Sequence, residues 1–98
     1  MNTPLLTRTV TVRNPLGLHA RPANLLARLA GQFESKILVG LNGEEVDCKS
    51  ILSLLTLGAG QGTELSLSAE GTDAQEALQS ISELFEAGFD ETNEMQGA

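Results

Sequence analysis

The stretch Lys36–Cys48, "KILVGLNGEEVDC", decides the fold because two apolar runs flank a two-residue turn signal. The runs are Ile37–Leu41 and Val46–Cys48, and Asn42-Gly43 lies between them. This dipeptide readily adopts the positive φ angles of a tight hairpin turn. A turn this short joins antiparallel neighbours. The sequence therefore predicts an antiparallel pair of strands from which a sheet can be built outward.

Two further segments alternate polar and apolar residues. Thr7–Asn14, "TRTVTVRN", places Val10 and Val12 on one face. Thr63–Gly71, "TELSLSAEG", repeats the alternation with three apolar residues opposite polar ones, namely Leu65, Leu67 and Ala69. A period of two residues indicates a strand with one buried face and one wet face. We expect these segments to complete a four-stranded antiparallel sheet.

Three helices are predicted between and after the strands. The first spans Ala20–Ala30, with a proline in its first turn and a glycine directly after it. The second is Ile51–Leu57, capped by Ser50. The third begins with a capping box of Thr72 and Gln75 and runs to Gly88. Its apolar residues keep a 3.6-residue rhythm at Ala74, Ala77, Leu78, Ile81, Leu84 and Phe85.

The order β-α-β-β-α-β-α predicts an α+β open-faced sandwich, a four-stranded antiparallel sheet with three helices on one face. A chain of 98 residues is the size of one domain, so we assign residues 1–98 to a single unit. We expect order from about residue 6 to residue 89. The tail 90–98, "DETNEMQGA", has no periodicity and is expected to be flexible.

The composition argues against several classes of function. A formal charge of −7 and only three aromatic residues, all Phe, disfavour nucleic acids and anionic membranes as partners. No stretch has the roughly 18 apolar residues of a membrane span. One histidine and one cysteine cannot complete a metal site, and no cofactor is expected. The single Cys48, read as a small buried hydrophobe, suits a reducing compartment, so we predict a cytoplasmic protein.

The only histidine, His19, falls at the start of the first predicted helix. Unpaired backbone N–H groups and the positive end of the helix dipole favour an anion there. A neutral imidazole can act as a nucleophile, and Arg21 offers a planar set of donors that matches phosphoryl oxygens. This pair predicts a phosphate-transfer site. The alternative is a surface or capping histidine in an α+β interaction module without phosphotransfer.

Two motifs resemble one known family. "NPLGLHARP", Asn14–Pro22, resembles the active-site motif of HPr, the histidine-containing phosphocarrier of the bacterial phosphoenolpyruvate-dependent phosphotransferase system. "KSILSLLTLGAGQG", Lys49–Gly62, resembles the second signature of that family. The element order matches the family fold from about Leu6 to Phe89.

The resemblance implies a phosphocarrier, not an enzyme. His19 would accept a phosphoryl group on Nδ1 from phospho-enzyme I, and Arg21 would steady that group. Enzyme IIA proteins would then receive it during sugar uptake, and we expect the carrier to be a monomer. The resemblance also implies that Ser50, in "KSI", is a regulatory target of an HPr kinase/phosphorylase, beside its role as a helix cap.

The second helix, "ILSLLTL", has more aliphatic residues than one buried stripe can use. We assign Leu54 and Leu57 to the core and predict an exposed partner-binding patch. Its members are Ile51, Leu52 and Leu55, extended on the first helix by Leu25 and Leu29. The alternative is that all of these side chains are buried.

Two branches of the family fit the sequence. One feeds sugar transport, and the other is a nitrogen-related regulatory paralogue that uses the same histidine chemistry to control targets. "LFEAGFDE", Leu84–Glu91, resembles the tail of the nitrogen-related branch, whereas "KSI" resembles branches with serine control.

Overall fold

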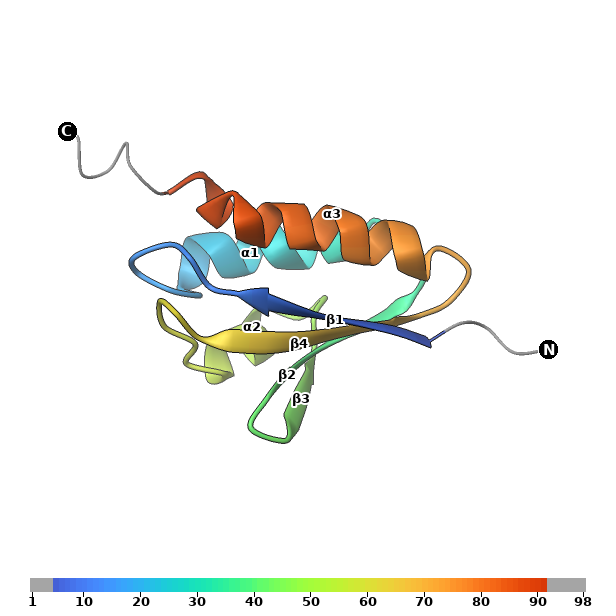
Figure 1. Ribbon diagram of the computed structural model, residues 1–98, viewed down its shortest axis with the longest axis horizontal. Coiled ribbons are helices and arrows are strands. Elements are labelled where there is room, and N and C mark those ends of the chain that lie inside the picture. The colour runs from blue at the N-terminus through green and yellow to red at the C-terminus, as the bar shows by residue number, and fades with distance from the viewer. Residues whose placement is uncertain (1–4, 92–98) are drawn as a thin grey trace.

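The computed structural model describes residues 5–91 and contains one four-stranded antiparallel sheet with the strand order β1-β4-β2-β3. Helices α1 and α3 lie side by side over one face of the sheet, and α2 packs against α1 and β3 (Figure 1). The predicted open-faced sandwich is confirmed. The elements are β1 (Leu5–Thr11), α1 (Ala20–Ala30), β2 (Lys36–Leu41), β3 (Glu44–Asp47), α2 (Ile51–Thr56), β4 (Glu64–Glu70), α3 (Ala74–Glu86) and the 3-10 helix η1 (Gly88–Asp90).

The hairpin of β2 and β3 forms where the sequence predicts it. Val39 pairs with Val46, and the turn residues Asn42 and Gly43 have φ angles of 55° and 85°. Both angles are positive, as a two-residue turn between twisted strands requires. The other strand pairs are also antiparallel. The first helix has the predicted bounds, and the second ends one residue earlier, at Thr56.

The core lies between the inner face of the sheet and helices α1 and α3. The inward residues of β4 are buried, as are four small or branched residues of α1, namely Ala23, Leu26, Ala27 and Ala30. On α3 the predicted stripe is buried except for Leu84, which is half-buried. Cys48 is fully buried, and that burial, assisted by Asp47, raises the pKa of its thiol to about 12. The thiol is therefore an unreactive core group.

The predicted capping box at the start of α3 is wrong. The N-cap is Asp73, and its carboxylate accepts hydrogen bonds from the backbone N–H groups of Glu34 and Ser35 at 2.9 and 3.0 Å. The Ser35 hydroxyl also donates to it. These bonds, the one from the hydroxyl foremost, lower the pKa of Asp73. A contact with the α1–β2 loop thus replaces local capping.

The expected flexible tail does not begin at Asp90. The 3-10 helix η1 continues the fold, and Glu91 is only 4% exposed. The cause is Phe89, a buried ring that packs edge-on against Phe85 with centroids 5.0 Å apart. Burial of this aromatic side chain draws the chain back onto the domain. The rest of the predicted tail, residues 92–98, lies outside the described residues.

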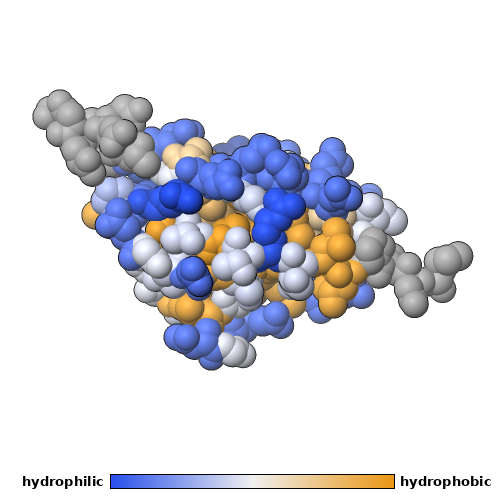
Figure 2. All heavy atoms as spheres, in the orientation of Figure 1, coloured by the Kyte–Doolittle hydropathy of each residue, from blue (hydrophilic) through white to orange (hydrophobic). Residues whose placement is uncertain are grey.

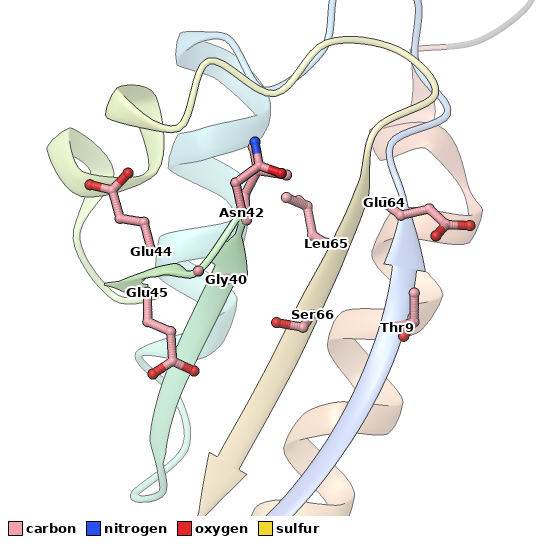
Figure 3. A pocket seen from close by; sticks show the side chains of 10 residues that line it. Thr9, Gly40, Asn42, Glu44, Glu45, Glu64, Leu65 and Ser66 are labelled. Carbon is pink, nitrogen blue, oxygen red and sulfur yellow. The ribbon is translucent and has the colours of Figure 1, made fainter.

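The outer face of α3 is polar, with exposed side chains at Gln75, Glu76, Gln79, Glu83 and Glu86. Figure 2 shows that hydrophilic residues cover α3. The face of the sheet opposite the helices carries a hollow near the β2–β3 turn, lined by polar and acidic residues together with Leu41 and Leu65 (Figure 3). Thr9, Glu45 and Ser66 are among them. This hollow contains no residue from the start of α1, so it is separate from the site described below.

The loop between β1 and α1 makes a tight turn at Gly17. Its φ is +73°, and a Cβ atom there would lie 2.5 Å from the carbonyl oxygen of Ala59. The next residue, Leu18, donates its N–H to that same carbonyl at 2.9 Å. The close approach of the two loops therefore requires glycine, and it fixes where α1 begins.

Gly17→Ala should destabilise the protein more than Gly43→Ala. Both glycines have positive φ, which costs an L-residue about 1–2 kcal/mol, but a Cβ at Gly43 meets nothing within 4 Å. The alanine at residue 17 adds a clash with backbone, which commonly costs about 1–3 kcal/mol more. Urea unfolding of both variants measures the difference. Equal losses of stability would contradict the close approach of the two loops.

Candidate functional site

His19 is the N-cap residue of α1, as the sequence predicts. Its backbone is extended, with φ −86° and ψ −167°, and its carbonyl accepts the first helical hydrogen bond, from Ala23 N–H at 3.0 Å. Its side chain makes no capping hydrogen bond. The ring is therefore not used to terminate the helix, and 36% of the side chain is exposed to solvent.

The structure brings Glu91 to this site, although the sequence analysis placed it in the tail. Its Oε1 lies 3.2 Å from His19 Nε2 and accepts a hydrogen bond from Asn14 Nδ2 at 2.9 Å. Its Oε2 accepts from Arg21 Nη1 at 2.9 Å. Arg21 Nη1 also donates to the carbonyl of Phe89 at 2.8 Å. His19 and Arg21 are thus joined through one carboxylate.

The carboxylate of Glu91 is ionised near neutral pH. Burial alone would raise its pKa, but hydrogen bonds from His19, Asn14 and Arg21 outweigh that effect, and the pKa of Glu91 is lowered. An ionised carboxylate only accepts hydrogen bonds. When the imidazole of His19 is neutral, Nε2 must therefore carry the proton, and Nδ1 keeps its lone pair.

Asn14 supports this arrangement from the loop before α1. The residue is fully buried, and its Nδ2 donates both to Glu91 and to the carbonyl of Gly17 at 2.8 Å. Its Oδ1 has no hydrogen-bond partner among the described residues. The amide therefore links the tight turn at Gly17 to the carboxylate of Glu91.

Ser50 occupies the N-cap of α2, so its predicted structural role is confirmed. Its Oγ accepts a hydrogen bond from Ser53 N–H at 3.2 Å, and the residue is half-buried. The hydroxyl is therefore engaged with its own helix.

The predicted apolar patch on α2 is exposed. Ile51, Leu52 and Leu55 are 38%, 76% and 37% exposed, whereas Leu54 is fully buried. Three side chains predicted either for the patch or for the core take an intermediate place: Leu25, Leu29 and Leu57 are half-buried and pack against the core. We name Ile51, Leu52 and Leu55 the α2 patch.

Leu16 is an apolar residue that the sequence analysis did not single out. It is 64% exposed and lies three positions before His19, in the loop that follows β1. Its position in "NPLGLHARP" was visible in the sequence, but only the loop geometry reveals its exposure.

Within residues 5–91 no cluster of three or more His, Cys, Asp or Glu side chains is placed to hold a metal ion. Over the same residues no helix is long and apolar enough to cross a membrane.

Comparison with known proteins identifies the family. The family model for the PTS HPr component phosphorylation site matches residues 6–87. A phosphocarrier protein HPr from Cupriavidus necator is 41% identical over 87 residues, which cover 89% of this chain and 98% of the relative. The crystal structure of HPr-C-His from Thermoanaerobacter tengcongensis superposes with a TM-score of 0.86 at 40% identity, covering 90% of this chain and 99% of that one.

A second structure from Thermoanaerobacter tengcongensis, described as an HPr dimer, superposes with a TM-score of 0.70 at 41% identity and covers 82% of this chain and 92% of that one. The family model and the curated relatives, which are named phosphocarrier proteins, define the class of this chain as a phosphocarrier and not an enzyme. The chain belongs to the HPr family of the phosphotransferase system.

Glu91→Gln should make the stability of the protein less dependent on acid. Because the pKa of Glu91 is lowered in the folded state, its ionised form stabilises the fold above the ordinary carboxyl pKa of about 4.3, and this contribution is lost as pH falls through the lower folded value. At pH 7 we expect the variant to lose about 1–3 kcal/mol, since its amide leaves a buried donor unpaired. Urea unfolding from pH 7 to pH 3 measures both effects.

Glu86→Gln is the matched control, since Glu86 is exposed on α3 five residues away. It should follow the wild-type pH profile. If the profile of Glu91→Gln also matched that of the wild type, the buried carboxylate would contribute nothing to the acid dependence.

Proposed function

We propose that His19 accepts a phosphoryl group on Nδ1 from phospho-enzyme I and passes it to enzyme IIA proteins during phosphoenolpyruvate-dependent sugar uptake in the cytoplasm. One observation carries this proposal. The imidazole is held through Nε2, 3.2 Å from the Glu91 carboxylate, and no described residue hydrogen-bonds Nδ1. The nitrogen that keeps its lone pair is therefore the one open to a partner.

The start of α1 suits an added phosphoryl group. The helix has 11 residues and no acidic residue in its first turn. Its first backbone N–H groups lack helical partners and lie at the positive end of the helix dipole. Phosphoryl oxygens are strong acceptors for such donors. An anion on His19 would therefore be stabilised without a metal ion.

Arg21 is proposed to stabilise the phosphoryl group. Its side chain is 50% exposed, and both of its hydrogen bonds to described residues come from Nη1. The donors on Nη2 and Nε are left for phosphoryl oxygens, which a guanidinium can bind in pairs. The bond to Glu91 keeps the side chain at the start of α1 before the phosphoryl group arrives.

The α2 patch is proposed as the docking surface for enzyme I and enzyme IIA proteins, with Leu25 and Leu29 at its border. Exposure of three aliphatic side chains on one short helix to water is unfavourable in the free protein, and such a patch is typical of a partner site. Ser50 directly precedes this patch in sequence. Phosphorylation of Ser50 by an HPr kinase/phosphorylase would add close to two negative charges there and oppose docking.

A second candidate is the nitrogen-related regulatory branch. The observation in its favour is the segment Leu84–Glu91, which resembles the tail of that branch and whose last residue contacts His19. The two candidates differ in their donors. Faster phosphorylation by a nitrogen-type enzyme I than by a sugar-type enzyme I would favour regulation. We propose a monomer as the active form in either case.

His19→Ala should abolish phosphorylation. With phosphoenolpyruvate and a cognate enzyme I, the wild type should gain one acid-labile phosphoryl group, because the chain has a single imidazole. Intact-protein mass spectrometry measures the gain of mass. Unchanged labelling in His19→Ala, or none in the wild type, would contradict the proposal.

Leu52→Ala should weaken enzyme I binding more than it lowers stability, because Leu52 is 76% exposed. The buried Leu54 supplies the control: Leu54→Ala should cost about 2–5 kcal/mol of folding stability.

Ser50→Asp should also weaken enzyme I binding and leave the fold intact, whereas Ser50→Ala should lose about 1 kcal/mol of folding stability because the cap is removed. Calorimetric binding and thermal melts distinguish these effects. Normal affinity in both Leu52→Ala and Ser50→Asp would place the docking surface elsewhere.

A further inference from the structure

We propose that the face of the sheet opposite the helices is a second docking surface, which binds an extended, positively charged segment of a partner protein. We name it the open face; it consists of the outward side chains that alternate with core residues along the four strands. The two hollows on this face are lined neither by His19 nor by the α2 patch. The inference therefore goes beyond the proposed function and does not rest on it.

The strand register places short side chains in the middle of the open face. Thr9 pairs with Ser66, and Ser66 also pairs with Gly40 on the neighbouring strand. In the adjoining row of the same face, Thr7 pairs with Ser68. None of these side chains is longer than that of threonine. The backbone of the central strands is therefore open to close approach from outside.

Gly40 forms the floor of the hollow near the β2–β3 turn. It lies inside β2, and its φ is not positive, so the backbone conformation does not require glycine. A Cβ atom at Gly40 would lie 2.6 Å from the hydroxyl oxygen of Ser66, which a rotation of that side chain can move. A glycine within a strand is typical of a point at which a ligand or another backbone approaches closely.

Carboxylates surround the same hollow (Figure 3). Its lining includes Glu44, Glu45 and Glu64, and all three residues are exposed. No lysine or arginine of the described residues lines it. A concave surface with charges of one sign concentrates the electrostatic potential, so this hollow attracts lysine and arginine side chains. The hydroxyl groups of Thr9 and Ser66 can accept hydrogen bonds from such donors.

The other end of the open face is more apolar. A second hollow, which shares Glu45 with the first, is lined there by Leu5, Leu38 and Lys36 among others. Leu5 is 62% exposed. Lys36 pairs with Glu70 across the strands, so the charges of these two residues offset each other. The two ends together match a partner segment with basic side chains at one end and an aliphatic side chain at the other.

The size of the open face indicates the kind of partner. Strand β4 has seven residues, which at about 3.3 Å per residue give a length of about 20 Å. An extended segment of about seven residues spans this length, whereas a stable complex of two folded domains needs a larger contact. We therefore expect binding that is weak, transient and sensitive to salt.

Binding can be tested with the full chain and a synthetic peptide of about eight residues, with arginine at alternate positions in one half and leucine in the other. In ¹H–¹⁵N spectra of ¹⁵N-labelled protein, the peptide should shift the signals of Thr9, Gly40 and Ser66 and not those of the α2 patch or α3. Its affinity should fall about tenfold when the ionic strength rises from about 0.01 M to about 0.1 M.

Three variants distinguish the hollow from the overall negative charge of the protein. Glu45→Gln combined with Glu64→Gln removes two carboxylates from the hollow and should weaken peptide binding about tenfold. Glu76→Gln combined with Glu86→Gln is the matched control, because it removes the same charge from exposed residues of α3; the affinity should change less than about twofold. Gly40→Ala retains every charge but raises the floor of the hollow, so binding should weaken about fivefold.

Equal losses of affinity in the two double variants would overturn the inference, because general attraction to a negative protein would then explain the binding. Absence of peptide binding, signal shifts confined to α2 or α3, or undiminished binding by Gly40→Ala would overturn it too. The same shifts on concentrating the protein without peptide would assign the open face to a second copy of the chain. Equally strong shifts with spermidine would make it a site for small cations. Either of these last two results would overturn the assignment to a partner segment, and none of the measurements involves phosphoryl transfer to His19.

Discussion

The buried carboxylate of Glu91 is the interaction on which the site depends. It accepts hydrogen bonds from groups that lie 77, 72 and 70 residues away in the sequence, on Asn14, His19 and Arg21. A charge removed from water is tolerated only when it is well supplied with donors. The loop before α1, the start of α1 and the turn after α3 must therefore be in place together. The site therefore forms only when the whole domain is folded, and the motif around His19 does not form it alone.

That closure has a conformational cost that the core offsets. Phe89 and Asp90 hold left-handed backbone conformations that L-residues rarely adopt, at a cost of order 1–3 kcal/mol each. Phe89 is fully buried against Phe85, and burial of a Phe side chain contributes about 1.5–3 kcal/mol. The apolar end of α3 thus supports the polar site, because the ring fixes the turn from which Glu91 reaches back to α1.

Most of the fold could be predicted from the sequence because its signals are local. The alternation in β4, the Asn42-Gly43 turn and the apolar rhythm of α3 each report on neighbouring residues, and the structure agrees with them. His19 and Arg21 were also visible, since a short motif carries both. Because each strand and helix must bury its apolar face between the two layers of the fold, few arrangements of these elements are possible.

The predictions that failed concern contacts between distant segments. Thr72 and Gln75 have the spacing of a capping box, but the carboxylate of Asp73 reaches the loop after α1. Glu91 follows a helix in a polar stretch without periodicity, so no local pattern distinguishes it from a tail. Its burial follows from the packing of Phe89 and from donors that precede it by more than 60 residues. The periodicity of residues along the sequence cannot reveal a contact between segments so far apart in the chain.

The N-cap residues of α1 and α2 use their side chains differently. At α2 the side chain of Ser50 accepts from its own helix and is used as a cap. At α1 the side chain of His19 makes no such bond, because its ring is turned toward Glu91. An absent cap costs a helix about 1 kcal/mol, and α1 tolerates the loss because Arg21 in its first turn bonds to both Phe89 and Glu91. In place of a cap within the helix, the hydrogen bonds from Arg21 to Phe89 and Glu91 stabilise the start of α1. The backbone donors at the start of α1 are therefore left without a side-chain cap, and the ring of His19 has a fixed position although 36% of the side chain is exposed.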